Sequence, residues 1–113
     1  MPPRGLRLRV GDMLEAVGKI QIYTASDSFE TFIADNMTVD ASLRNIIVIG
    51  EAANHIPDTV KGRYPEIPWL QIRGMRNTVV HSYFELDFEI IWDAIEHDVP
   101  LLGEQLQTIL ANE

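Results

Sequence analysis

Five polar side chains that could act together on one substrate lie within a short stretch of the sequence, QIRGMRNTVVHSYFELD. They are Arg73, Arg76, Asn77, His81 and Tyr83. Arginine carries a permanent charge on a planar fork that binds phosphate oxygens and stabilises charge in a transition state. Histidine titrates near neutral pH, so it can take a proton from a ribose 2′-hydroxyl or give one to the leaving oxygen. This set of side chains suits metal-independent cleavage of a phosphodiester in RNA.

Structural explanations of the same side chains stay open on spacing alone. His81 could cap the C-terminal end of a helix, where a cation interacts favourably with the helix dipole. Tyr83 could be a core aromatic with its hydroxyl at the rim. The two arginines could instead form a surface network of ion pairs, with partners among Glu66, Glu85 and Asp87.

The sequence has no pattern typical of a metal site or of a thiol enzyme. It contains no cysteine, and its three histidines are scattered, without a His-Glu-x-x-His or paired-histidine spacing. We therefore expect no cofactor. We interpret His55 and His97 as structural residues, and Trp69 and Trp92 as core anchors rather than platforms for base stacking.

A helix over residues 68–81 would divide the polar stretch between different faces. One face is apolar and is expected to meet the core, through Ile72, Met75 and Val79. A second face, an arc of about 80°, carries Arg73, Asn77 and His81. Arg76 would lie about 140° from His81, so one straight helix does not easily aim both at one phosphate. A working site then needs a bend after Val80 or a second chain.

Helical spacing of the apolar residues extends over most of the chain. We predict a first helix from Leu6 to Ala25 and a short second helix through Ala34, with Asp27 and Glu30 as its capping box. Asp40 is the expected N-cap of a third helix over ASLRNIIVIGEAANHI.

The second half of the chain is expected to hold two further helices. PDTVKGRYPEIPW reads as a helical turn followed by a loop, and the helix over 68–81 follows it. YFEL indicates a break, and Asp87 caps a last helix that is kinked or restarted near Pro100. Four to five main helices with short connections predict a single all-α bundle.

Charge limits the partners that the chain can bind. The formal net charge is −8, which disfavours non-specific adhesion to nucleic acid or to an anionic membrane. No lysine or arginine follows Arg76, so the acidic C-terminal part could dock on a basic partner. No apolar run approaches the roughly 18 residues of a membrane span. We expect a soluble, cytoplasmic protein.

The segments LRNIIVIGEAANHIP and YPEIPWLQIRGMRNTVVHSYFELDFEIIWDAIEHDVPLL resemble the HepT-like proteins of the HEPN superfamily, a group of all-helical, toxin-type ribonucleases. The resemblance extends from about Arg7 to Leu110. The hallmark of the family is an arginine, four residues, a histidine, one residue and a tyrosine, and a polar residue follows the arginine. The matching positions here are Arg76, Asn77, His81 and Tyr83; Gly50–Ala53 and Ile67–Trp69 match as well.

The resemblance implies a single HEPN-type domain over residues 1–113, which forms a homodimer or a higher homo-oligomer. It further implies a metal-independent endoribonuclease that acts on tRNA or mRNA, as the toxin of a type VII-like toxin–antitoxin pair. Arg76 would stabilise the scissile phosphate and His81 would act as general acid or base, with Arg73 and Asn77 supporting phosphate binding. An MntA-type nucleotidyltransferase antitoxin would silence the toxin by transferring AMP from ATP to Tyr83.

A two-fold interface could also supply Arg76 of one chain to His81 of the other. Two rival interpretations stand beside the enzyme. One is a non-catalytic HEPN subunit that partners a nucleotidyltransferase and holds a nucleotide or RNA phosphate, and the other is a purely structural homo-oligomeric bundle. Glu51 could hold an arginine of the cluster or satisfy the polar seam of the bundle, and we expect the second role.

Overall fold

Helices and short connections make up residues 5–113, the part of the chain that the computed structural model describes, and no strand occurs in this part. The prediction of an all-α bundle is confirmed. The elements are α1 (Leu6–Thr24), α2 (Phe29–Ala34), α3 (Asn36–Asn54), α4 (Asp58–Arg63), α5 (Trp69–His81), η1 (Tyr83–Glu85), α6 (Phe88–Asp93), η2 (Ala94–Asp98) and α7 (Val99–Asn112).

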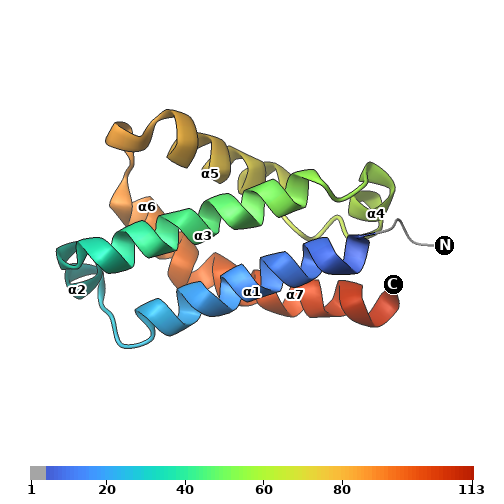
Figure 1. The fold of residues 1–113 in the computed structure, drawn as a ribbon, viewed down its shortest axis with the longest axis horizontal. Coiled ribbons are helices and arrows are strands. Elements are labelled where there is room, and N and C mark those ends of the chain that lie inside the picture. Colours follow the sequence, from blue (N-terminus) through green and yellow to red (C-terminus); the bar gives the residue numbers. More distant parts are fainter. Residues whose placement is uncertain (1–4) are drawn as a thin grey trace.

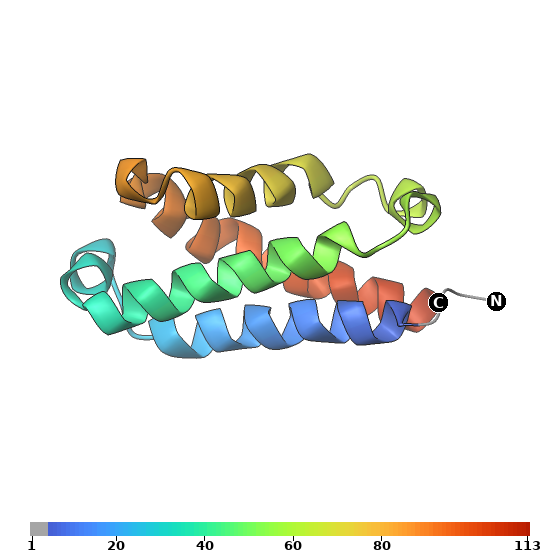
Figure 2. The ribbon, with the colours of Figure 1, turned by 45° about the horizontal axis from the view of Figure 1, so that its top comes forward.

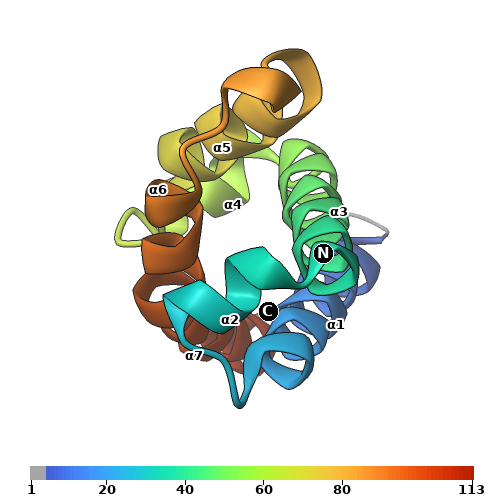
Figure 3. The same ribbon diagram turned by 90° about the vertical axis from the view of Figure 1, so that its left-hand side faces the viewer.

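Long helices run along the bundle, and short ones close its ends (Figure 1). Helix α3 lies between α1 and α5, and the C-terminal helix α7 packs against α1 (Figure 2). Viewed along its length, the bundle has α2 across one end, close to the start of α3 and to α6 (Figure 3). Helix α5 thus forms an outer edge, with α3 as its main support.

The main core is built by α1, α3 and α7. On α1 the buried apolar side chains recur every three or four residues, as the sequence predicts: Leu6, Val10, Met13, Val17 and Ile20. Tyr23, which continues the same spacing, is exposed instead, because the buried face at the end of α1 is formed by Thr24. At the capped end, the rings of Phe32 and Trp92 lie 5.0 Å apart between centroids, which confirms Trp92 as a core anchor.

Two predicted helix starts are wrong by a few residues. The capping box of α2 is formed by Ser28 and Thr31, while Asp27 accepts a hydrogen bond from the Thr31 hydroxyl at 2.9 Å. The third helix begins at Asn36 after an N-cap at Asp35, whose carboxylate accepts the amide hydrogens of the first turn. Asp40 is therefore not an N-cap: it lies in the second turn of α3, on an exposed face.

The predicted interruption of the last helix near Pro100 is confirmed, because the segment is divided into α6, the π-helical turn η2 and α7. Asp87 caps α6 as expected, by accepting hydrogen bonds from the amides of Glu89 and Ile90. The chain then widens into a π-helical turn over Ala94–Asp98, and Pro100 occupies the first turn of α7. Proline lacks an amide hydrogen and its ring crowds the preceding turn. A wider π-helical turn accommodates the proline, so the chain remains helical from α6 into α7.

The N-terminal end of α5 is anchored by Trp69, which is half-buried. Its indole Nε1 donates a hydrogen bond to the carbonyl of Tyr64 at 3.1 Å, and the ammonium of Lys61 lies 5.7 Å from the ring centroid. Trp69 thus fixes where α5 starts after the loop. None of the helices in residues 5–113 combines the length and the apolar character that a membrane span needs.

Candidate functional site

Helix α5 presents only a narrow apolar face to the rest of the bundle. Val79 is its single buried residue, and Ile72 and Met75 are half-buried. The predicted apolar face of α5 does face the core, but its side chains are less deeply buried than those of α1. Beneath it lies an apolar cavity of about 100 Å³, lined by residues of α3, α5, η2 and α7 that include Ile46, Ile49, Ile72, Met75, Val99 and Leu102. Most of the surface of α5 consequently faces solvent.

Gly50 allows α5 to approach α3 closely at one point. A methyl group added at Gly50 would overlap the Cβ and Cγ atoms of Arg76. The aliphatic stem of Arg76 therefore lies directly on the main chain of α3, where any larger residue would push the helices apart. The Gly-Glu-Ala-Ala segment thus needs glycine at position 50, because a residue without a side chain lets Arg76 pack directly on the main chain of α3.

The guanidinium of Arg76 is oriented by two polar partners. Its Nη2 forms an ion pair with Glu51 Oε1, and its Nη1 donates a hydrogen bond to Asn77 Oδ1 at 3.1 Å. The third donor, Nε, is buried and has no acceptor within residues 5–113. An exposed ion pair adds little stability, so the effect of Glu51 is chiefly to fix the direction of the guanidinium.

The expected role of Glu51 is thereby corrected. The carboxylate is about half exposed, at 47% of its side-chain surface, and it lies at the edge of the bundle rather than within a polar seam. It pairs with Arg76 because the close contact at Gly50 brings α5 within reach of the next residue on α3. Glu51 therefore belongs to the arginine cluster.

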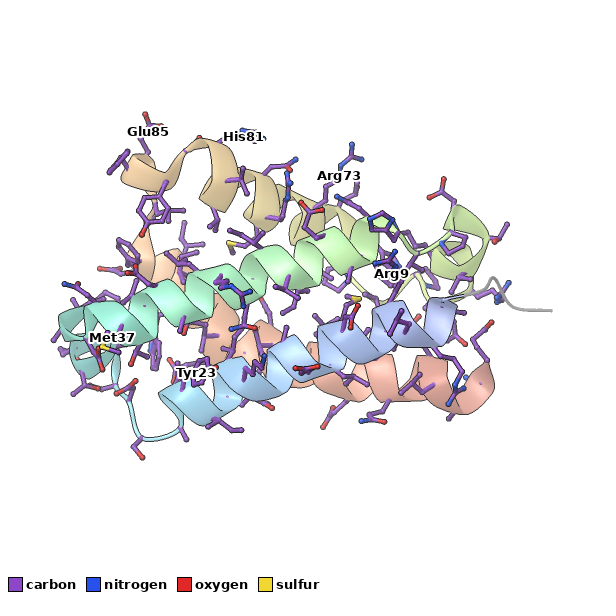
Figure 4. All side chains as sticks on the ribbon, viewed as in Figure 1. Arg9, Tyr23, Met37, Arg73, His81 and Glu85 are labelled. Atoms are coloured by element: carbon purple, nitrogen blue, oxygen red, sulfur yellow. The ribbon has the colours of Figure 1, made fainter. Side chains whose placement is uncertain are left out.

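Arg73 and His81 project from α5 away from the other helices (Figure 4). Both are exposed, and their side chains make no hydrogen bond or ion pair within residues 5–113. The alternative arginine pairs with Glu66, Glu85 and Asp87 do not form in this part of the chain either. The side chains of Arg73 and His81 are thus open to a ligand that approaches from solvent.

Arg76 and His81 are not brought together within one chain. Helix α5 runs from Trp69 through His81, and the backbone leaves the helical conformation only at Ser82. The bend therefore comes one residue too late to swing His81 toward Arg76. Five helical residues separate them by roughly 7.5 Å along the axis and about 140° around it. Of the two solutions expected from the sequence, the bend is excluded for this chain.

Tyr83 lies in the turn η1 and faces α3. Its hydroxyl donates a hydrogen bond to Asp40 Oδ1 at 3.2 Å, although the two residues are 43 positions apart. This hydrogen bond, together with the negative charge of Asp40, raises the pKa of Tyr83 above its ordinary value. The ring is 43% exposed and meets Phe84 edge-on, with 5.6 Å between centroids. Tyr83 is therefore a surface residue, and the alternative of a core aromatic does not hold.

The remaining histidines lie apart from this cluster. The backbone of His55 caps the C-terminal end of α3, and His97 pairs with Asp93 one turn earlier at 3.1 Å. Within residues 5–113, no three histidine, aspartate or glutamate side chains are placed to hold a metal ion. Sequence reasoning missed Asp40 as a neighbour of Tyr83, because nothing in a single sequence links these two positions.

Comparison with known proteins places these residues in a family context. The family model for ribonuclease HepT-like proteins matches residues 13–109, which include every residue of the cluster. A protein of Thermococcus cleftensis named "Probable ribonuclease HepT" is 37% identical over 98 residues, or 87% of this chain and 89% of the relative. A "Putative RNase" of Methanocaldococcus jannaschii is 33% identical over 110 residues, or 97% of this chain and 91% of the relative. No solved structure matches.

Proposed function

Since this chain belongs to the HepT-like ribonuclease family, we propose that it is an endoribonuclease that cleaves RNA without a metal ion. The observation that carries the proposal is the guanidinium of Arg76, which is held by Glu51 and Asn77 on a helix whose outer face is otherwise open. An oriented guanidinium with donors to spare can bind the equatorial oxygens of a phosphate as charge develops on them.

The chemistry assigned to His81 is proton transfer. His81 accepts the proton of a ribose 2′-hydroxyl as that oxygen attacks phosphorus, or donates a proton to the departing 5′-oxygen. The products are a 2′,3′-cyclic phosphate and a free 5′-hydroxyl, so no water or metal is consumed in this step. Arg73 and Asn77, on the exposed side of the same helix, supply further contacts to the phosphate backbone.

We assign the complete site to a homodimer, because Arg76 and His81 diverge within one chain. Exposed apolar side chains on and just after α5 support this assignment: Leu70, Val80 and Phe84. A two-fold axis near α5 would cover them and would place Arg76 of one copy beside His81 of the other. A small basic cleft at such a seam would also reconcile RNA binding with the net charge of −8.

The test of this site uses mixed dimers. The purified protein is incubated with tRNA and mRNA in the presence of EDTA, and wild-type cleavage is expected to persist. Arg76→Ala and His81→Ala chains should each be inactive, and mixing them in equal amounts should restore about one quarter of the activity, because half of the dimers then contain one intact site of two. Dimers that form normally in light scattering but regain no activity would contradict sharing across the interface.

We further propose that the protein is the toxin of a toxin–antitoxin pair and that a nucleotidyltransferase silences it by adding AMP to Tyr83. The exposure of Tyr83, which lies just after α5, supports this assignment. AMP at that position would add bulk and negative charge two residues from His81, where it would repel RNA and compete for the arginines. Mass spectrometry of the chain co-expressed with its nucleotidyltransferase should show AMP mass increments on Tyr83.

The non-catalytic alternative is a HEPN subunit that partners a nucleotidyltransferase and holds a nucleotide or RNA phosphate without cleaving it. A binding subunit would leave tRNA and mRNA intact while it binds ATP or AMP in a titration. Growth arrest by the wild-type chain, and none by His81→Ala at equal expression, is the outcome expected for the enzyme.

A further inference from the structure

The three tyrosines of the chain differ in two properties that decide whether a phenol can act as a nucleophile. Tyr83 is 43% exposed and donates to a carboxylate, that of Asp40. Tyr64 also donates to a carboxylate, that of Glu113, but it is only 5% exposed. Tyr23 is 41% exposed and has no hydrogen-bond partner for its hydroxyl within residues 5–113. Of the three tyrosines, only Tyr83 is both exposed to an incoming reagent and hydrogen-bonded to a carboxylate that can accept its proton.

We propose that Asp40 is the proton acceptor when AMP is transferred to Tyr83, so that the two residues form a base and nucleophile pair. This inference rests on the proposed silencing reaction and names the part that this chain plays in it. Helix α3 carries Asp40 on its exposed face, and the turn η1 holds the Tyr83 hydroxyl against it at 3.2 Å. The nucleotidyltransferase then supplies the nucleoside triphosphate, while the toxin itself supplies both the nucleophile and its base.

Asp40 is free for this role. Its carboxylate makes no other side-chain hydrogen bond and no ion pair within residues 5–113, although Arg44 lies one turn later on α3. The Asp40 carboxylate therefore stands ready to accept a proton at the moment of attack, rather than sharing its charge with a basic neighbour.

The phenolic oxygen of Tyr83 attacks the α-phosphorus of ATP, the bond from that phosphorus to the bridging oxygen of the β-phosphate breaks, and pyrophosphate leaves. The phenolic proton passes to Asp40 and then to water. A hydrogen bond to a carboxylate does not release the phenolate in the resting protein, but it lets the proton leave as the oxygen–phosphorus bond forms and the phenol becomes more acidic. Asp40 thus acts during the attack and not before it.

The experiment measures the initial rate of AMP transfer from labelled ATP and Mg²⁺ at a series of toxin concentrations, with a catalytic amount of the nucleotidyltransferase that modifies the wild-type chain. The asparagine variant Asp40→Asn should slow the transfer by about 100-fold or more, with the loss in kcat rather than in KM for the toxin. Its remaining rate should rise with pH toward the titration of the phenol, whereas the wild-type rate should be nearly flat between about pH 6 and pH 8.

Asp58→Asn is the matched control, since it removes the same charge from an exposed position in the first turn of α4, beyond the C-terminal end of α3, and should leave the transfer unchanged. Asp40→Glu should keep part of the rate, because it retains a base. A separate titration of the phenol without the partner enzyme should show a lower pKa for Tyr83 in Asp40→Asn than in the wild type.

Two negative results are distinguishable. A wild-type chain that carries no AMP on Tyr83 would overturn the silencing reaction itself, and the role of Asp40 with it. A wild-type chain that is modified on Tyr83, beside an Asp40→Asn chain with the same kcat and the same pH profile, would overturn the role of Asp40 alone. A loss confined to KM would also overturn it, because it would make Asp40 a contact for the partner enzyme.

Discussion

Helices α1 and α5 both pack on α3, but they differ in how much of their surface is buried there. Helix α1 buries seven of its 19 residues, whereas α5 buries one of its 13. The apolar side chains of α1 are enclosed by α3 and α7, while α5 exposes Arg73 and His81 on the outer edge of the bundle. Stability is therefore concentrated on one side of α3 and candidate chemistry on the other, so substitutions on the two sides should affect different measurements.

The largest effect is expected from His81→Ala. Loss of the proton-transferring group should reduce RNA cleavage by about 10²- to 10⁴-fold. Its melting temperature should stay close to that of the wild type, because the side chain is exposed and makes no hydrogen bond or ion pair within residues 5–113. Cleavage that survives in a homogeneous, folded preparation would remove His81 from the site.

Leu106→Ala tests the opposite side. Leu106 on α7 is fully buried, and its truncation should lower the free energy of unfolding by about 2–5 kcal/mol in urea denaturation. The matched control is Leu8→Ala on α1, where the side chain is 65% exposed and the expected change is within about 0.5 kcal/mol. Equal losses at the two positions would contradict the concentration of stability in the core that α1, α3 and α7 build.

Gly50→Ala tests the contact between the two sides. The added methyl group meets the stem of Arg76, so α5 must shift, and we expect destabilisation of about 1–3 kcal/mol together with reduced RNA cleavage. Gly18→Ala on α1 is the control, because space is open there and alanine favours the helix by roughly 0.5–1 kcal/mol. The two glycine variants should therefore shift the melting temperature in opposite directions.

Glu51→Gln should separate orientation from stability. The amide keeps the shape of the side chain but removes the charge that directs the Arg76 guanidinium. We expect about a tenfold loss of cleavage, which corresponds to roughly 1.4 kcal/mol of transition-state stabilisation, and an unfolding free energy within about 1 kcal/mol of the wild type. Cleavage at the wild-type rate would show that Arg76 needs no partner.

The smallest effect concerns acid stability at the end of α7. Hydrogen bonds from Arg63 and Tyr64 lower the pKa of Glu113 below its ordinary value of 4.5. A carboxyl whose pKa is depressed in the folded state stabilises the fold above its unfolded pKa, and this contribution is lost as the pH falls through the folded value. Urea denaturation of Glu113→Gln should show a shallower loss of stability below about pH 4.5 than the wild type.

The parts of the fold that follow from periodicity were predictable. The spacing of the apolar residues on α1 predicts the helix and its buried face. Pro100 indicates where the last helix is interrupted. The two misplaced caps have a common cause. Asp27 and Asp40 are good capping types, but which candidate caps a helix depends on where the backbone leaves the extended conformation, and that is decided by the packing of the short α2 against α6.

Within the candidate site, the residues of the local motif could be identified from the sequence, but the residues of α3 that contact them could not. Arg76, His81 and Tyr83 stand out by type and spacing, and a wheel shows that the first two diverge. Glu51 contacts Arg76 and Asp40 contacts Tyr83 only because α5 and η1 pack against α3. The paired residues are 25 and 43 positions apart in the sequence. A single sequence contains no signal for such contacts.

The apolar cavity beneath α5, which is partly open to solvent, makes hydrostatic pressure a selective probe of this molecule. Loosely packed apolar volume that water fills, or that is lost when a segment detaches, shifts the conformational equilibrium as pressure rises. The cavity borders Ile72 and Met75 of α5, whereas no residue of α1 lines it. Compression should therefore perturb the resonances of α5 at lower pressure than those of α1, so the responses of the two helices can be separated without changing a residue.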